Sequence, residues 1–299
     1  MAYENLPPYF PVQYSKTFEK LLAQNDHRFG GKYTMCDIAG EKKRINQHEA
    51  LRARKITGRA TDTTVDERVN YARWVTPFKY EITERIDEWD EADLGEILMP
   101  TGEIMLDHTS AYNYERDLTC RDALEGNATT GLDGTTLTAL PSTQIVDDDF
   151  VRTGSTVQSG LTFAKVGRSS RILTANEVEK TGRFAMIGST EEEDLIQDVA
   201  EAKNSGDFGV IPTVPDGMID GKTWYGYSWT TFESLTTASN ITNCLFWQQR
   251  QLIFGDGQRK SYTDILPTKS HALQIRDTWR MGAVRREEKG VVIVETYHA

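Results

Sequence analysis

Carboxylates crowd two parts of this chain, and paired carboxylates are the groups with which glycosidases and acid proteases cleave their substrates. Asp147, Asp148 and Asp149 follow one another, and a second acidic run extends from Glu81 to Glu96. An enzyme of this kind holds two carboxyl groups at a set distance and raises the pKa of one of them. Carboxylates packed this densely are more typical of a solvated surface. The Asp147–Asp149 run also lacks the ligand spacing of a calcium-binding loop, so we expect neither a catalytic pair nor a metal site.

Motifs for other kinds of chemistry are not evident in the sequence. The segment Gly255-Asp-Gly257 lacks the spacing of a phosphate-binding loop. The histidines are isolated from one another and offer no local pair of zinc ligands: His27, His48, His108, His271 and His298. The cysteines are far apart, which indicates free thiols in a reducing compartment: Cys36, Cys120 and Cys244. We therefore expect no catalytic residue and no cofactor.

An aromatic cluster near residue 227 supports one alternative function. Its side chains could stack on a sugar ring or a base: Trp224, Tyr225, Tyr227 and Trp229. Together with an acid pair, they would make a carbohydrate-binding or glycoside-active protein. Aromatic residues in a strand more often pack in a core or an interface. This alternative also leaves residues 1–80 without a purpose.

Opposite charges are segregated into two neighbouring blocks of the chain. The basic block, within 42–73, includes Arg52, Arg54, Lys55 and Arg59. The acidic block that follows includes Asp87, Glu88, Asp90, Glu91 and Asp93. Large apolar residues are sparse between 45 and 75, so the basic segment cannot form a core of its own. We expect these nine residues to form contacts between copies, because head-to-tail contacts build rings and lattices. Two solvated stretches without a partner are the alternative.

Composition indicates a globular protein that is not a general nucleic-acid binder. The 299 residues are 38% hydrophobic and 26% charged, with a formal net charge of -11. This length can bury a sizeable core. Broad affinity for phosphate groups would require net positive charge on the contacting face. We see no signal peptide and no apolar run of the roughly 20 residues that span a bilayer, so we expect synthesis in the cytoplasm and no membrane partner.

The hydrophobic pattern predicts a mixed α and β chain without the regular strand–helix alternation of a doubly wound sheet. The proline-rich start predicts an extended arm, and 32–76 should form two extended limbs joined by an irregular tip. Helices are expected at 16–24, at 101–126, after a cap at Thr162, and to 203 after a capping box at Thr190–Glu193. Residues 126–160 should form a loop or hairpin. Strands are expected at 78–82, 184–187, 224–232, 244–254, 273–283 and 291–294.

The helix at 101–126 has a polar face opposite an apolar stripe. The stripe contains Ile104, Ala111 and Leu118, with Tyr114 and Leu124 flanking it. Such a helix should lie across a sheet with one side in solvent.

The order of these segments resembles that of the major capsid proteins of tailed bacteriophages, which share the Hong Kong 97-type fold. The resemblance rests on soft structural patterns in three segments and not on a catalytic motif. They are an N-terminal Tyr14–Gln24, a charged extended Phe78–Asp90 before one long helix, and a final Met281–Val294.

The resemblance implies an α+β capsid fold with an arm at 1–30 and an extended β loop at 31–80. It further implies a peripheral domain at 81–177 and 267–299, with a long spine helix, and an axial domain at 178–266. The subunit would form hexamers and pentamers of itself in an icosahedral virion around packaged DNA, without reading its sequence. Scaffolding, portal and decoration proteins would be its other partners, and assembly would take place in the bacterial cytoplasm.

Overall fold

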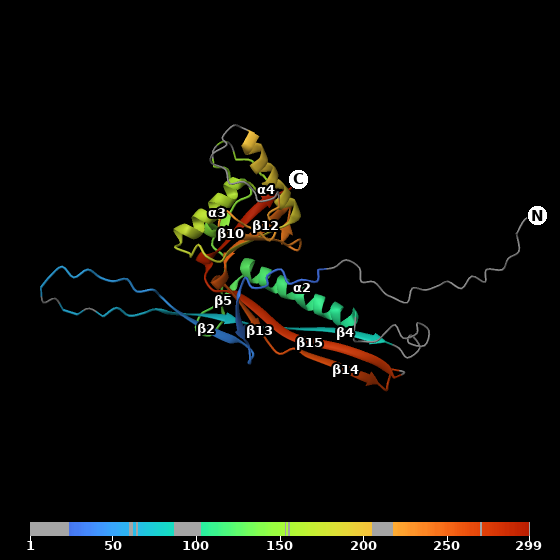
Figure 1. Cartoon of the computed structure of the whole chain (residues 1–299). Coiled ribbons are helices and arrows are strands. Elements are labelled where there is room, and N and C mark those ends of the chain that lie inside the picture. The colour runs from blue at the N-terminus through green and yellow to red at the C-terminus, as the bar shows by residue number, and fades with distance from the viewer. Residues whose placement is uncertain are drawn as a thin grey trace, which may run out of the picture.

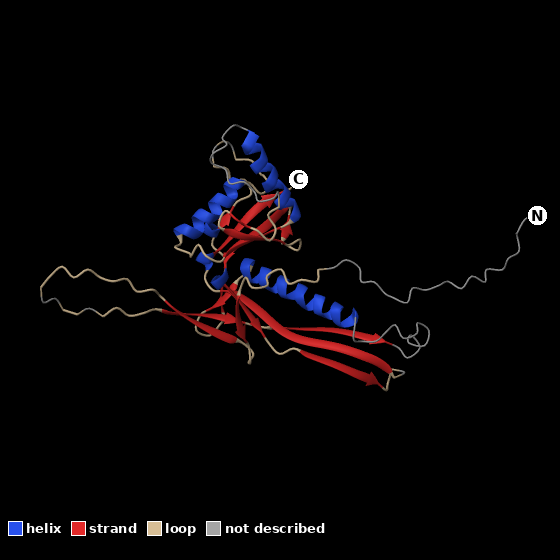
Figure 2. Cartoon of the chain, viewed as in Figure 1, coloured by secondary structure: helices blue, strands red, loops and turns tan. Residues whose placement is uncertain are grey.

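The computed structural model describes residues 24–59, 62–63, 65–86, 103–152, 154, 156–204, 218–269 and 271–298. These residues form three β-sheets and three α-helices (Figures 1 and 2). The helices are α2 (Glu103–Glu125), α3 (Phe163–Ala175) and α4 (Ser189–Asn204). Short 3-10 turns occur at Ser142–Gln144, Gln249–Gln251 and Glu288–Gly290.

A seven-stranded sheet forms the upper body in Figure 1, together with α3 and α4. Its path is β7 (Ile145–Val146), β16 (Val291–Tyr297), β12 (Ile241–Gln248), β8 (Arg183–Ile187), β10 (Tyr227–Thr231) and β9 (Thr223–Trp224), with β11 (Thr237–Ala238) beside β12. Alternate residues of the central strands enter two different cores. Val292 and Val294 pack with the helices α3 and α4, whereas Val291 and Ile293 pack on the other side. Burial on both faces explains why this strand is an unbroken apolar run.

A five-stranded sheet lies beneath α2 and carries the second core. Its strands are β1 (Thr34–Asp37), β13 (Leu252–Asp256), β15 (Ala272–Arg285), β14 (Lys260–Leu266) and β4 (Phe78–Ile86). Trp279 on β15 meets the Tyr112 ring of α2 edge to face, with ring centroids 5.5 Å apart. The second core also takes Leu245 and Trp247 from the seven-stranded sheet, so α2 contributes to a core that both sheets share.

A four-stranded sheet holds the base of a long projection. Its order is β2 (Lys43–His48), β3 (Asn70–Val75), β5 (Ala128–Thr130) and β6 (Thr136–Thr138). Strands β2 and β3 are antiparallel, and the chain between them extends away from the body at the left of Figure 1. Of the two limbs predicted for 32–76, β2 and β3 with the chain that leads away from them match the prediction, whereas Thr34–Asp37 pairs with β13 (Leu252–Asp256) in the five-stranded sheet instead.

The strongly patterned elements appear where the sequence predicts them. Strands β4, β8, β15 and β16, the helices α2 and α3, the Thr162 cap and the 128–138 hairpin are confirmed. The capping box is misplaced, because α4 already begins at Ser189, whose backbone N–H donates to Glu233 Oε1. The expected helix at 16–24 lies outside the described residues.

Two strand predictions are wrong because each joins segments that the fold separates. The expected strand 224–232 is a hairpin, in which Tyr225 and Gly226 have φ of 50° and 79° and form the turn. Positive φ at both central residues is typical of a two-residue hairpin turn. The expected strand 244–254 is broken by the turn at Gln249–Gln251, after which the chain enters the other sheet as β13.

The apolar stripe expected on α2 does not define its buried face. Ala111 and Leu118 are only half-buried. The buried positions are His108, Ser110, Tyr112, Asp117, Cys120 and Leu124. His108 and Asp117 are polar because they hold neighbouring segments, as described below.

Candidate functional site

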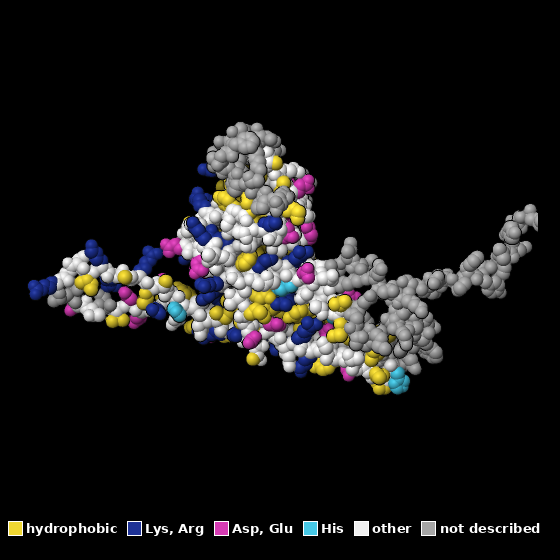
Figure 3. All heavy atoms as spheres, viewed as in Figure 1, with side chains coloured by type: hydrophobic (Ala, Val, Ile, Leu, Met, Phe, Trp, Pro, Cys, Tyr) yellow, Lys and Arg dark blue, Asp and Glu magenta, His cyan; other side chains and the backbone are white. Residues whose placement is uncertain are grey.

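The projecting loop between β2 and β3 presents apolar and basic side chains without a core beneath them. The side chains of Leu51, Ile56 and Val65 are 47%, 75% and 82% exposed. The four basic residues singled out in the sequence lie on this loop and are all exposed: Arg52, Arg54, Lys55 and Arg59. Figure 3 shows dark-blue Lys and Arg side chains along the projection. The loop therefore offers contact area that the rest of the described chain does not cover.

One of the four basic residues already has a partner within the chain. Arg54 Nη2 lies 2.8 Å from Asp66 Oδ1 on the opposite limb, and both side chains are about half-exposed. The predicted acidic partners, Asp87, Glu88, Asp90, Glu91 and Asp93, lie outside the described residues. The contact between the two charge blocks therefore remains a prediction.

A buried charge cluster at the base of the loop connects all three sheets. Glu288, in the turn before β16, accepts a hydrogen bond from Arg73 Nη2 of β3 at 2.6 Å. Its other carboxylate oxygen lies 3.6 Å from Nε of Arg285 on β15. The side chain of Arg285 is fully buried. One carboxylate thus faces two guanidinium groups where the three sheets meet.

Arg285 also closes the end of helix α2. Its guanidinium donates to the carbonyl oxygens of Leu124 and Gly126, and to that of Thr138 on β6 at 2.7 Å. The last carbonyl groups of a helix have no partners within it and carry partial negative charge, so a cation at this end is stabilising. The orientation of α2 is therefore fixed against the base of the loop.

The environment of the cluster shifts the pKa values of Glu288 and Arg285. Burial alone would raise the pKa of Glu288, but the hydrogen bond and charge of Arg73, with the charge of Arg285, bring it below its ordinary value. Burial lowers the pKa of Arg285, and the charge of Glu288 opposes that effect. Paired charges of this kind favour their ionised forms, and removing one partner leaves the others buried without compensation.

Two carboxylates bind histidines beside α2, an arrangement that the sequence analysis missed. Asp117 on α2 lies 2.6 Å from Nδ1 of His27 and accepts hydrogen bonds from the backbone N–H groups of Arg28 and Phe29. His108 on α2 lies 2.8 Å from Asp277 on β15. Each histidine is isolated in sequence and finds its carboxylate on a distant segment. The sequence did offer one indication of this arrangement, namely the polar residues His108 and Asp117 in a helix that was expected to be half-buried.

Lys165 occupies a cage of backbone carbonyls at the start of α3. Its ammonium group is fully buried, and its three N–H groups are shared among Asp148 O, Ser159 O, Gly160 O and Glu295 O, which lie at 2.8, 2.6, 3.0 and 3.1 Å. Burial lowers the pKa of Lys165 to about 8, while the charges of the nearby carboxylates, Asp148, Asp149 and Asp194, oppose this shift. The side chain thus joins the 148–160 loop to β16 with one positive charge.

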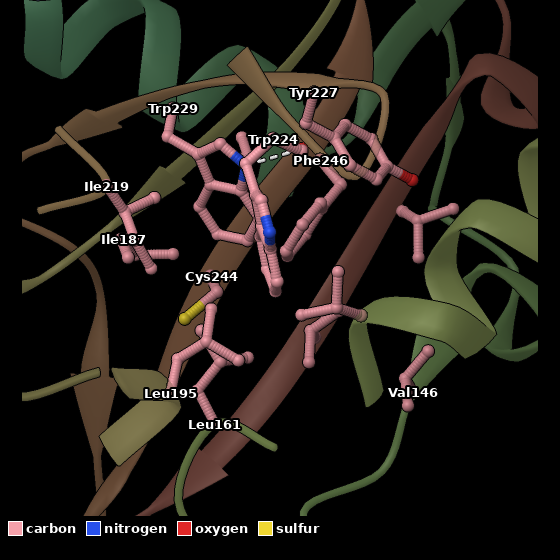
Figure 4. Close-up of a cluster of buried hydrophobic side chains, with 14 of the residues drawn as sticks. Val146, Leu161, Ile187, Leu195, Ile219, Trp224, Tyr227, Trp229, Cys244 and Phe246 are labelled. Atoms are coloured by element: carbon pink, nitrogen blue, oxygen red, sulfur yellow. Dashed lines mark hydrogen bonds between the residues drawn. The ribbon is translucent and has the colours of Figure 1, made fainter. Parts of the chain in front are cut away.

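The aromatic cluster near residue 227 belongs to the core and not to a binding platform. Trp224, Tyr227 and Trp229 are 4%, 0% and 1% exposed. Figure 4 shows them packed around Phe246, with the Trp229 indole N–H donating to the carbonyl of Trp224 at 2.8 Å. Only Tyr225, at the hairpin turn, is accessible. A sugar ring cannot stack on faces that the core already covers, so the carbohydrate alternative has no site here.

The described residues contain little that could bind a metal or form a nucleophile. They include no group of three or more His, Cys, Asp or Glu side chains placed to hold a metal ion. All three cysteines are free, and burial raises the pKa of Cys120 and Cys244 well above the ordinary value, which suppresses their thiolates. Across the same residues, every helix is too short or too polar to span a lipid bilayer.

Solved structures that resemble this chain include the capsids of several phages. The family model described as phage capsid protein matches residues 6–297. The capsid structure of cyanophage Pam1 is 15% identical, with a TM-score of 0.73 and 99% of each chain covered. The capsid of Ralstonia phage GP4 is 10% identical, with a TM-score of 0.72 over 100% of this chain and 98% of that chain.

More distant structures agree with this fold. A chain from Mycobacterium phage Che8 is 12% identical, with a TM-score of 0.63 over 98% of each chain. At these identities the likeness to solved structures shows the fold alone. No curated protein sequence matches the chain.

Proposed function

The chain belongs to the phage capsid protein family, and we propose that it is the major subunit of an icosahedral head that encloses double-stranded DNA. Membership of this family makes it a structural protein of the virion and not an enzyme. The observation that carries the proposal is the projecting loop. Leu51, Ile56 and Val65 stand exposed on a segment without a core, and exposed apolar area of this kind marks an interaction surface.

The Hong Kong 97-type architecture is the arrangement that we propose for the fold. In it, residues 1–30 form the arm and 31–80 the extended loop. Helix α2 is then the spine helix of a peripheral domain built on the five-stranded sheet, and the seven-stranded sheet forms the axial domain.

The two cores support domain boundaries that differ from those expected from the sequence. Strand β16 and helix α3 pack in the first core with the seven-stranded sheet, which favours placing them in the axial domain. Strands β13 and β14 pair with β15 of the five-stranded sheet, which favours placing them in the peripheral domain. The division into two domains depends on which distant segments pair in one sheet. The hydrophobic periodicity of the sequence carries no information about that pairing.

Contacts between copies would then use the loop and the acidic stretch. We propose that Arg52, Lys55 and Arg59 dock on Asp87, Glu88, Asp90, Glu91 and Asp93 of a neighbouring subunit, with Arg54 shared between that neighbour and Asp66. Buried apolar area from the loop would supply most of the affinity, while the charges fix the register. Hexamers and pentamers would form in this way in the bacterial cytoplasm. Portal, scaffolding and decoration proteins would be further partners.

Negative-stain electron microscopy of the purified full-length protein tests the proposal. We expect rings or closed shells, because a loop that lacks a core should be satisfied only by a neighbour. A monodisperse monomer at high concentration, with residues 49–59 resistant to protease, would contradict it.

A further inference from the structure

We propose that the two free edges of the five-stranded sheet, β4 and β14, pair with each other between neighbouring copies, so that the sheet continues from one subunit into the next. This inference rests on the proposed self-assembly and assigns it a second interface, separate from the projecting loop. The partner is a second copy of this chain.

Both edge strands are long and regular, and no other described strand covers their outer edges. Among the described residues, β4 and β14 each pair only with β15, and most of their side chains are exposed. Nine residues of β4 and seven of β14 oppose β15 one to one, without a bulge. Neither Phe78–Ile86 nor Lys260–Leu266 contains proline. Proteins usually protect such edges with bulges, prolines or short strands, because an open edge is a template for another strand.

The face of the sheet turned away from α2 has complementary charges at its two edges. Asp277 and Trp279 of β15 face α2, so the alternate residues Gln274, Arg276 and Thr278 face away. One cross-strand row on that face is Lys260–Thr278–Glu81, and another is Asp264–Gln274–Arg85. Each row therefore begins and ends with opposite charges.

Continuation of the sheet without stagger would place those charges opposite each other. Lys260 of one copy would face Glu81 of the next, and Asp264 would face Arg85. Tyr262 would face Thr83 in the row between them. Directly opposed side chains of this kind are the units that stabilise a sheet, whereas like charges in the same places oppose pairing.

The face toward α2 adds an apolar pair to the same register. Ile265 on β14 and Ile86 on β4 both pair with Leu273 of β15, so they stand at the two ends of one cross-strand row. Ile265 is 63% exposed, which is unusual for a large apolar residue of a strand. In the continued sheet, Ile265 of one copy would meet Ile86 of the next and lose that exposure.

The directions of the strands are also compatible with continuation. Strands β4 and β14 are both antiparallel to β15, so they run parallel to each other. A copy added at the β4 edge would present its β14 edge in the same direction, and its own β4 edge would stay open. Such a head-to-tail contact joins successive subunits into a ring or a lattice.

Engineered cysteines test this pairing in assembled protein. Arg85→Cys and Asp264→Cys are combined with Cys36→Ser, which removes the accessible native thiol. Within one chain these positions are separated by two strand spacings, or roughly 9.5 Å. A disulfide requires Cα atoms within about 7 Å, so a bond between the two positions must join different chains. We expect mild oxidation of particles to give a ladder of dimers and larger species on a non-reducing denaturing gel.

The matched control is Lys79→Cys with Asp264→Cys in the same background. Lys79 pairs with Arg280 and Asp264 with Gln274, so the control thiols lie in different rows. This pair should stay monomeric on the gel. Particles of the Arg85→Cys/Asp264→Cys protein that form normally and yet give no ladder would overturn the inference and leave the proposed function intact. Failure of the wild-type protein to form particles would instead contradict the proposed function.

A charge exchange provides an independent measurement if the thiol variant assembles poorly. Arg85→Asp alone would set two carboxylates against each other, and particle yield should fall at least fivefold. Adding Asp264→Arg exchanges the charges and should return the yield to within twofold of wild type. Wild-type yield from Arg85→Asp alone, or no recovery in the double variant, would contradict the pairing.

Discussion

Arg73 and Glu288 form a 2.6 Å ion pair that fastens the base of the projecting loop to the turn before the last strand. Arg285, fully buried, stands on the other side of the same carboxylate and donates to the end of α2. The projecting loop, strand β15 and helix α2 are therefore linked through the Glu288 carboxylate and its two arginine partners.

Glu288→Gln should destabilise the subunit strongly at neutral pH. The substitution leaves Arg73 and Arg285 buried without a counter-charge, and breaking a buried pair in this way costs about 3 to 5 kcal/mol. Urea unfolding of the unassembled subunit at pH 7, followed by tryptophan fluorescence, measures the loss. Glu287→Gln is the matched control because that carboxylate is largely exposed and lies 4.0 Å from its lysine partner. Equal stability of the two variants would contradict a structural role for the cluster.

The difference between wild type and Glu288→Gln should shrink in acid. The pKa of Glu288 is lowered in the fold from its ordinary 4.5. A carboxylate with a lowered pKa contributes stability that is fully present above the unfolded pKa and is lost as pH falls through the folded pKa. Wild-type protein below that range carries a neutral Glu288 and resembles the glutamine variant. Unfolding midpoints recorded from pH 6 to pH 3 should therefore converge, and a constant difference would show that the charge of Glu288 is not responsible.

Elements with strong local patterns could be predicted from the sequence, because the periodicity of their apolar residues directly reflects which face of the element is buried. The parity of Leu273, Ile275 and Trp279 predicts β15, and the apolar run at Val291 predicts β16. The turn at Tyr225–Gly226 was missed because aromatic residues continue through it, although the glycine was an available indication.

The polar cluster could not be predicted because it depends on contacts between distant segments. Arg73 and Glu288 are 215 positions apart, and His108 and Asp277 are 169 apart. The local spacing of residues in the sequence gives no indication of such a pair. The charge blocks were visible in the sequence for the opposite reason, since each is local in the chain. Which residues of the loop are free to bind a neighbour required the structure, because Arg54 already faces Asp66.

Lys165→Met should loosen the loop that leads into α3. At pH 7 the ammonium group is largely charged, since its pKa is about 8. Its removal leaves four carbonyl oxygens without this donor, and hydrogen bonds to a charged group are worth about 1.5 to 3 kcal/mol each before the cost of burying the charge. A net loss of about 3 kcal/mol is expected.

Hydrogen exchange locates the effect of Lys165→Met. The Ser159 amide donates to Asp148 O, and the Tyr297 amide donates to Ser159 O, so both amides should exchange faster in the variant. Lys180→Met is the control, since that lysine is exposed and should change stability by less than about 0.5 kcal/mol. Unchanged protection of Ser159 in the Lys165 variant would contradict the proposed clamp.

Reversing the charge of the loop should block assembly without unfolding the subunit. Arg52, Lys55 and Arg59 are the residues to change, because Arg54 already forms an ion pair with Asp66 within the chain. One exposed ion pair is worth only about 0 to 1 kcal/mol, so single substitutions should have little effect. Changing all three residues to Glu places like charges opposite the acidic stretch. Particle yield, measured by sedimentation, should fall at least tenfold while the unfolding midpoint of the subunit stays unchanged.

A control with the same change in net charge separates docking from general repulsion. Arg152, Arg171 and Lys180 are exposed and lie away from the loop, so their combined change to Glu should leave most assembly intact. Asp87, Asp90 and Asp93 changed to Lys should block assembly by themselves, and mixing these subunits with the loop variant should partly restore particles where opposite faces meet.

Salt adds a second measurement, because the Debye length falls from about 10 Å at 0.1 M to about 3 Å at 1 M. Early capsomer formation should weaken over that range, whereas finished shells, stabilised by buried apolar area, should resist it. Normal assembly of both triple variants would mean that the charge blocks are solvated surfaces and that the loop docks by its apolar side chains alone.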